Sequence, residues 1–154
     1  MSSSNKSGFI NRSKASEETI EFAKKIGAKK IGIAVCSGLY KEGQMIAKIF
    51  RSNGFEVYGV ICKVGAVRKT EIGLSEEYEK TGPSMCNPIM QANILNKAKT
   101  DLNIVVGLCV GHDSLFNKYS EALTTTLIVK DRVTGHNPAA ALYTSNVYYR
   151  ELYG

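Results

Sequence analysis

The stretch Val105–Asp113, V-V-G-L-C-V-G-H-D, constrains the fold more than any other part of this chain. An apolar run leads into Gly107-Leu108-Cys109-Val110-Gly111, and His112 and Asp113 follow at once. This order is typical of a buried strand that ends in a glycine-permitted turn and opens a helix. A thiol, an imidazole and a carboxylate therefore fall within one short turn between a strand and a helix.

Similar apolar segments alternate with amphipathic ones along the whole chain. We expect strands at Ile31–Cys36, Phe55–Cys62, Leu102–Cys109 and Thr125–Val129. Capping residues and apolar residues at helical spacing predict helices between them. These helices begin near Ser16, Ser37, Asn87-Pro88, Asp113 and Asn137-Pro138.

Alternating strands and helices predict βαβ units with right-handed crossovers. We therefore predict an α/β fold, a single Rossmann-like or flavodoxin-like three-layer domain with a four-stranded, mainly parallel sheet in the order 2-1-3-4. Residues 16–154 would form this domain, and the Ser/Asn/Lys-rich residues 1–15 a flexible tail. Residues 63–84 show little periodicity, and so long a loop is usually functional or mobile.

The composition excludes several classes of protein. The net charge of +6 permits a small anionic ligand, but the basic residues are scattered and are not interleaved with aromatic residues, so no nucleic-acid partner is expected. No apolar stretch reaches the roughly 20 residues that cross a bilayer, and the amino terminus has no signal-peptide core. We expect a cytoplasmic protein with reduced thiols, where cysteines more often serve metal binding or catalysis than disulfides.

The cysteines share one kind of position. Cys36, Cys62 and Cys109 end three of the expected strands, and Cys86 comes just before the Asn87-Pro88 helix start. In a parallel sheet, functional groups gather at the carboxyl ends of the strands, and helix amino termini there stabilise thiolates. His112 and His136 also fall at strand ends.

This placement predicts a metal site at that edge of the sheet. Its ligands would be Cys36, Cys62, Cys86 and Cys109, with His112 as a further ligand or a support for one. Thiolates with or without one imidazole suit zinc or an iron–sulfur cluster, and the residues do not choose between these. No two cysteines form a C-x-x-C pair, so the fold would have to assemble the site. Cysteine is also a small apolar residue that suits buried strands, which is the simpler explanation of each position alone.

Two local motifs indicate a thiol enzyme instead. The segment Gly107–Gly111 matches a glycine-x-nucleophile-x-glycine elbow with Cys109 as the nucleophile, although His112 lies only three residues further on. Cys62–Arg68 matches the Cys-x-x-Gly-x-x-Arg loop of cysteine-dependent phosphatases, in which Arg68 would hold an oxyanion beside the thiolate. Ile61 and Lys69 replace the histidine and the hydroxyl residue that flank that loop in the phosphatases.

A third alternative is a non-catalytic module that holds a small anion at helix amino termini. The segment Lys130-Asp131-Arg132-Val133 and His136 could add an anion contact there, although a solvated turn explains these charges equally well. The sequence thus leaves open whether the protein is an enzyme.

Four motifs resemble those of a known family. They are C-K-V-G at 62–65, M-C-N-P-I at 85–89, G-L-C-V-G-H-D at 107–113 and V-K-D-R-V-T-G-H-N-P at 129–138. They look like an uncharacterised family, a domain of unknown function, of predicted metal-binding proteins from anaerobic bacteria and archaea. The resemblance implies metal binding through cysteine and histidine. This chain departs from the longer members, since residues 1–15 lack their cysteine-rich segment.

Overall fold

The four strands form one parallel sheet in the computed structural model, which describes residues 14–66, 68–72, 75, 77 and 84–154. The strands are β1 (Lys30–Val35), β2 (Glu56–Ile61), β3 (Leu102–Val106) and β4 (Leu123–Ile128), in the order β2-β1-β3-β4. All three pairings are parallel. The predicted α/β class, strand order and Rossmann-like arrangement are confirmed.

The register brings the strand ends level with one another. Val35 pairs with Ile61 on one side and with Val106 on the other, and Val106 pairs with Ile128. We call the side of the sheet where these residues lie the carboxyl edge. Residues that directly follow any of the four strands therefore come close together in space.

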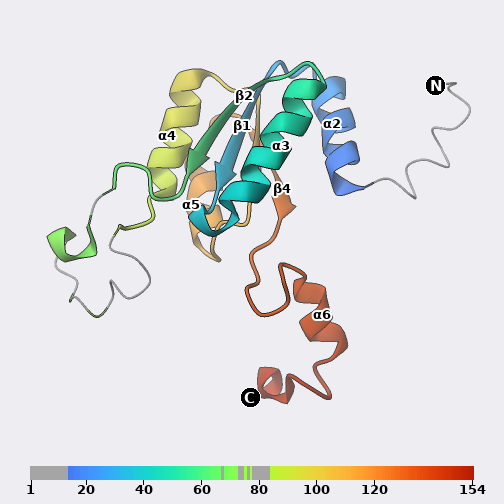
Figure 1. Cartoon of the computed structure of the whole chain (residues 1–154), viewed down its shortest axis with the longest axis vertical. Helices are drawn as coiled ribbons and strands as arrows, with labels where there is room; N and C mark the ends of the chain where they lie inside the picture. Colours follow the sequence, from blue (N-terminus) through green and yellow to red (C-terminus); the bar gives the residue numbers. More distant parts are fainter. Residues whose placement is uncertain (1–13, 67, 73–74, 76, 78–83) are drawn as a thin grey trace, which may run out of the picture.

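Helices cover both faces of the sheet (Figure 1). On one face α2 (Ala15–Lys25) and α3 (Tyr40–Ser52) bury Ile20, Phe50 and their neighbours against the strands. On the other face α4 (Pro88–Ala98) and α5 (His112–Tyr119) form a second core cluster that includes Leu95 and Phe116. This double cover explains why β1 and β3 are apolar and buried along almost their whole length.

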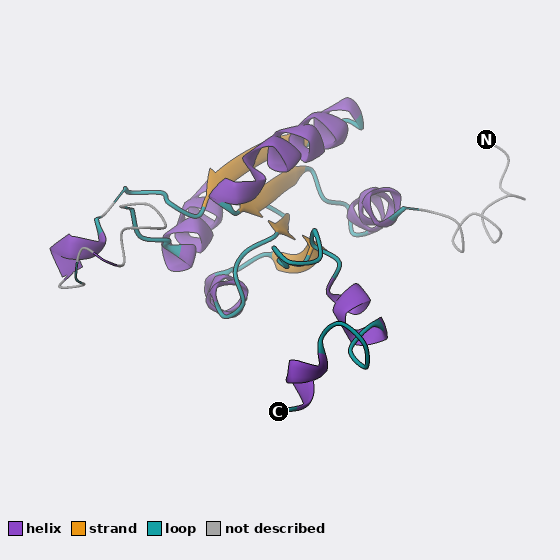
Figure 2. Ribbon diagram, turned by 60° about the horizontal axis from the view of Figure 1, so that its bottom comes forward, coloured by secondary structure: helices purple, strands orange, loops and turns teal. Residues whose placement is uncertain are grey.

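Short helical turns and a C-terminal segment complete the described chain. The 3-10 turn η2 (Ser37–Leu39) leads from β1 into α3, and η3 (Lys69–Ile72) follows β2. Figures 1 and 2 show α6 (Pro138–Tyr143) and η5 (Arg150–Tyr153) extending away from the sheet, and neither has a buried residue. The core therefore lies within residues 15–128.

The predicted boundaries shift at a few places. β3 ends at Val106 rather than Cys109, because Gly107 has a φ of 61° and takes the chain out of the strand. Helix α2 already begins at Ala15, within the segment expected to be a flexible tail. The rest of that expectation, residues 1–13, lies outside the described residues. Within the described part of the chain, every helix is too short or too polar to cross a lipid bilayer.

Candidate functional site

The carboxyl edge collects one functional group from each strand. Cys36 directly follows β1, Cys62 directly follows β2, Cys109 lies in the turn after β3, and Lys130 lies just beyond β4. Cys86 joins them from the residue before Asn87, whose side chain caps α4 by accepting the Met90 amide. All four cysteines carry free thiols.

Three of these cysteines form a line of interacting sulfurs, which we call the thiol row: Cys86, Cys62 and Cys36. The Cys86 thiol donates to the Cys62 sulfur over 3.6 Å, the Cys62 thiol donates to the Ser37 hydroxyl over 3.8 Å, and the Cys62 and Cys36 sulfurs shift each other's pKa. Cys36 and Cys62 are only 5% and 3% exposed, whereas Cys86 is half-buried. Cys86 is therefore the member of the thiol row that is partly accessible to solvent, and the other two are buried.

Lys130 terminates the thiol row at its buried end. Its ammonium group donates a hydrogen bond to the Cys36 sulfur at 2.8 Å, a close contact between a cation and a thiolate. The hydrogen bond from Cys62 and the Lys130 ammonium lower the pKa of Cys36 to about 4, although burial opposes this shift. Cys36 is therefore a thiolate at neutral pH.

Cys62 is the neutral partner of that thiolate. Its hydrogen bond to the negative Cys36 sulfur and its burial both raise its pKa. Two adjacent thiolates in a dry site would repel each other, so one proton stays between the two sulfurs. The Lys130 contact determines that Cys36 carries the charge.

Backbone amides at the start of η2 support both sulfurs. The Ser37 amide donates to the Cys62 sulfur over 3.3 Å, and the Gly38 amide hydrogen-bonds to Cys36. On its other side η2 packs closely against Gly107, which has no side chain. A Cβ at Gly107 would lie 2.0 Å from the Leu39 Cδ1 and 3.7 Å from the Lys130 Cε. Glycine there lets the end of β3 approach η2 and the lysine that stabilises the thiolate.

Arg132 brings a second cation to the carboxyl edge. Its guanidinium donates to the Cys109 sulfur over 3.6 Å. The interaction with Cys109 raises the pKa of Arg132, and Cys36 adds a weaker electrostatic contribution, so the guanidinium stays charged beside the Cys109 sulfur. Arg132 thus electrostatically links Cys109 to the thiol row.

The side chains of Lys130 and Arg132 come from a turn that hydrogen bonds close. The Asp131 carboxylate accepts the amides of Val133 and Thr134 at 3.0 and 3.1 Å, and these bonds lower its pKa. His136 closes the turn, because its Nδ1 accepts the Asp131 amide at 3.1 Å and its own amide donates to the Asp131 carbonyl. His136 adopts a φ of 65° there. Its visible role is to shape the loop rather than to contact a sulfur.

His112 and Asp113, the last residues of the stretch Val105–Asp113, lie at the start of α5. The His112 amide donates to the Cys109 carbonyl, and no hydrogen bond joins its imidazole to a sulfur in the described structure. Asp113 accepts the amides of Gly111 and Ser114 at 3.0 and 2.8 Å, so it caps the turn. The positive φ angles of this turn belong to Gly107 and Gly111, and Cys109 itself is not strained.

The predicted phosphatase-like loop has a different local geometry. After Cys62, the amides of Val64 and Ala66 donate to nearby carbonyls of Ile61 and Lys63, which form successive turns. Arg68 pairs with Ser84 in an antiparallel bridge, which brings the far end of the loop back beside β2. Val67 lies outside the described residues. The bridge explains how Cys86 returns to Cys62.

The arrangement of the sulfurs meets the requirements of a metal site only in part. Among the described side chains, no group of three or more His, Cys, Asp or Glu is arranged to hold a metal ion. One pair does have a suitable spacing. In a tetrahedral site with Zn–S bonds of about 2.3 Å, neighbouring sulfurs lie about 3.8 Å apart, and the Cys62 and Cys86 sulfurs are 3.6 Å apart. A third sulfur would have to join them by side-chain rotation.

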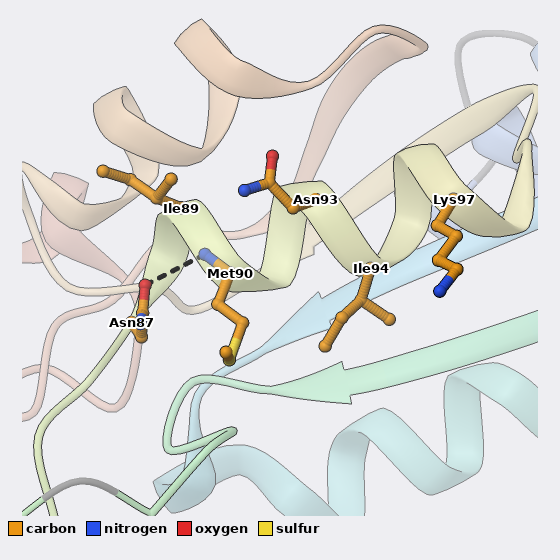
Figure 3. Close-up of a pocket in the computed structure, with 6 residues that line it drawn as sticks. All are labelled: Asn87, Ile89, Met90, Asn93, Ile94 and Lys97. Atoms are coloured by element: carbon orange, nitrogen blue, oxygen red, sulfur yellow. Dashed lines mark hydrogen bonds between the residues drawn. The ribbon is translucent and has the colours of Figure 1, made fainter.

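A shallow groove of about 380 Å³ lies on the outer side of α4 (Figure 3). Its wall combines apolar and amide side chains with one lysine, all from α4 and its capping residue: Asn87, Ile89, Met90, Asn93, Ile94 and Lys97. It contains none of the cysteines or histidines. The groove therefore does not coincide with the thiol row, and we place the candidate site at the carboxyl edge.

Two residues of the site, Lys130 and Gln91, make contacts that the sequence does not predict. Lys130 was considered only as an anion contact, and its position after the last strand was the available signal. Gln91 is completely buried, and its amide nitrogen donates to the carbonyls of Val35 and Val60, near the ends of β1 and β2. It holds α4 against the strands that carry Cys36 and Cys62. A lone glutamine within a helix gives no such signal.

Comparison with known proteins places the chain in a family without an assigned activity. It is 56% identical over 133 residues to the uncharacterized protein MJ0455 of Methanocaldococcus jannaschii, an alignment that covers 86% of this chain and 67% of the relative. The family model described as protein of unknown function (DUF1847) matches residues 1–127, which include all four cysteines and end just before Lys130 and Arg132. The expected resemblance to an uncharacterised family is confirmed: the chain belongs to the DUF1847 family.

Proposed function

We propose that the protein binds a metal ion or an iron–sulfur cluster through the thiolates of its carboxyl edge. Cys36, Cys62 and Cys86 would be ligands, and Cys109 or His112 would complete the set. The observation that carries this proposal is the contact between the Cys62 and Cys86 sulfurs, 3.6 Å apart, together with the interaction of Cys62 with a third cysteine, Cys36.

The chemistry of the donors supports zinc or an iron–sulfur cluster. Thiolates are the soft ligands that both prefer, and the thiol row offers them in a largely buried position. A metal bound by several thiolates carries net negative charge. Lys130 and Arg132 lie against Cys36 and Cys109 and would offset it.

Protonation defines the order in which ligands become available. The low pKa of Cys36 makes it a ready ligand, whereas the raised pKa of Cys62 means that this thiol must lose its proton as it binds. Metal binding would therefore release protons and weaken as the pH falls. The hydrogen bond of Lys130 to Cys36 need not be broken, because a ligating sulfur can still accept it.

Anaerobic purification followed by elemental analysis and an absorption spectrum tests the proposal. We expect either about one equivalent of zinc per chain or the visible absorption of an iron–sulfur cluster. C62S should abolish binding, since Cys62 is the central sulfur, and N93S on the outer side of α4 is the matched control. A colourless protein that is metal-free as purified, and that takes up neither zinc nor iron and sulfide afterwards, would overturn the proposal.

A second candidate is a thiol enzyme, favoured by one observation: the Cys36 thiolate contacts Lys130 at 2.8 Å. The two local sequence motifs indicate Cys109 or Cys62 as the nucleophile. In the structure Cys109 contacts Arg132 rather than a base, and Cys62 is neutral, so Cys36 is the better nucleophile. Alkylation of the metal-free protein separates the two candidates. Preferential modification of Cys36, despite its burial, supports the enzyme, whereas even modification of all four cysteines contradicts it.

A further inference from the structure

We propose that Cys62 and Cys86 form a reversible disulfide, so that the metal-free protein is a dithiol that exchanges electrons with low-molecular-weight disulfides. This activity goes beyond metal binding and does not require it.

The distance between the two sulfurs supports this bond. They lie 3.6 Å apart, and a disulfide bond is about 2.0 Å long, so the sulfurs must approach by about 1.6 Å. The backbones are already adjacent, because the Asn87 amide, next to Cys86, donates to the Cys62 carbonyl at 2.6 Å. Rotation of the two side chains would close the remaining gap.

Cys86 is the more adaptable of the two possible partners of Cys62. It lies in residues 85–87, which belong to no helix or strand, and it is more exposed than Cys62 and Cys36. Cys36 is held more firmly. Its amide donates to the Val106 carbonyl, and its sulfur accepts the Lys130 ammonium. We therefore assign the bond to Cys62 and Cys86 rather than to Cys36 and Cys62.

The exchange consists of two substitutions at sulfur. The Cys86 thiolate attacks one sulfur of a disulfide RSSR, which forms a mixed disulfide at Cys86 and releases one RS⁻. The Cys62 thiol then gives up its proton to the released RS⁻ as its sulfur attacks the Cys86 sulfur, which forms the Cys62–Cys86 bond and releases a second RS⁻. The two thiol protons end on the two released thiols. The protein is oxidised by two electrons and RSSR is reduced by two, and an external dithiol reverses the reaction.

The disulfide would also regulate the proposed metal site, and this part of the inference rests on the proposed function. A bond between Cys62 and Cys86 removes two of its ligands at once. Metal binding and oxidation therefore exclude each other, since a sulfur in a disulfide is no longer a thiolate ligand.

The test uses the full chain, stripped of metal and equilibrated with mixtures of reduced and oxidised glutathione. Free thiols are then blocked, and the intact mass and cysteine-containing peptides are analysed. We expect a species that has lost two hydrogen atoms, with a cross-link between the peptides of Cys62 and Cys86, and its loss after treatment with a dithiol. If no such species forms at any glutathione ratio, or if the cross-link joins another pair, the inference is wrong.

Variants identify the order of the two steps. C62S should stop at a glutathione adduct on Cys86, C86S should form no cross-link, and N93S, outside the site on α4, is the control that reacts as the wild type does. Because C62S alters a buried site, circular dichroism checks its fold, and the half-buried C86S provides an independent result. A cross-link that persists in C86S overturns the assignment.

A zinc arm separates this inference from the proposed function. Zinc-loaded protein that resists oxidation supports both. A disulfide in a protein that never binds metal leaves the inference standing and removes the metal site. If the protein binds metal but forms no disulfide after the metal is stripped, the proposed metal site stands and the disulfide inference is wrong.

Discussion

Replacing Cys36 by serine should change how the stability of the metal-free protein depends on pH. The folded pKa of Cys36 is about 4, whereas an unfolded cysteine titrates near about 8.5. Between these values the unfolded chain binds one proton that the native chain does not. A depressed acid pKa contributes stability above the unfolded pKa and loses it as the pH falls towards the folded pKa.

The expected magnitude follows from that one proton. Within this window the free energy of unfolding rises with pH by about 1.4 kcal/mol per unit, or about 2.7 kcal/mol between about pH 5.5 and about pH 7.5. Cys62 adds nothing to this slope, because its raised pKa keeps it protonated in both states throughout the window. C36S should therefore have a slope smaller by about 1.4 kcal/mol per pH unit.

Urea unfolding under reducing conditions at several pH values measures this difference. Slopes are compared rather than absolute stabilities, so any packing cost of the serine cancels. C109S leaves the contact between Cys36 and Lys130 intact and should keep the wild-type slope. Parallel pH dependences for the wild type and C36S would refute the assignment of a buried thiolate to Cys36.

Three further changes test the surroundings of the site. K130M removes a charge-assisted hydrogen bond worth about 1.5–3 kcal/mol and should raise the pKa of Cys36 by about 1–2 units, which the ultraviolet absorbance of the thiolate reports. G107A should destabilise the fold by about 2–5 kcal/mol in urea unfolding, because its φ is 61° and its Cβ would lie 2.0 Å from a leucine methyl carbon. G59A, whose Cβ would meet nothing within 4 Å, should be far milder. D113A leaves two backbone amides uncapped and should cost about 1 kcal/mol in the same assay, while D113N should recover part of it.

Much of the fold could be predicted because each element carries local signals. The Asn87-Pro88 pair marks the start of α4, and the mostly apolar segment Leu102–Val106 marks a strand buried on both faces. Parallel pairing then follows from the alternation of strands and helices. The same logic predicted that Cys36, Cys62 and Cys109 would share one edge, since each follows a strand.

The contacts within that edge could not be predicted in the same way. The bridge between Arg68 and Ser84 brings the segment that carries Cys86 back towards Cys62. This pairing joins residues far apart in the sequence, and no short-range pattern predicts it. Lys130 is 94 residues from Cys36, and in the sequence it resembles any lysine in a solvated turn. The sequence therefore indicated a group of thiols but not which of them is ionised.

The distance along the chain between Cys36 and Lys130 has a consequence for protein synthesis. Translation proceeds at about 5–20 residues per second, so a separation of 94 residues corresponds to roughly 5–20 s. During that time the Cys36 thiol has emerged while the ammonium that will ionise it does not yet exist. The pKa of Cys36 therefore reaches its final, lowered value only when the last strand joins the sheet and brings Lys130 to the sulfur.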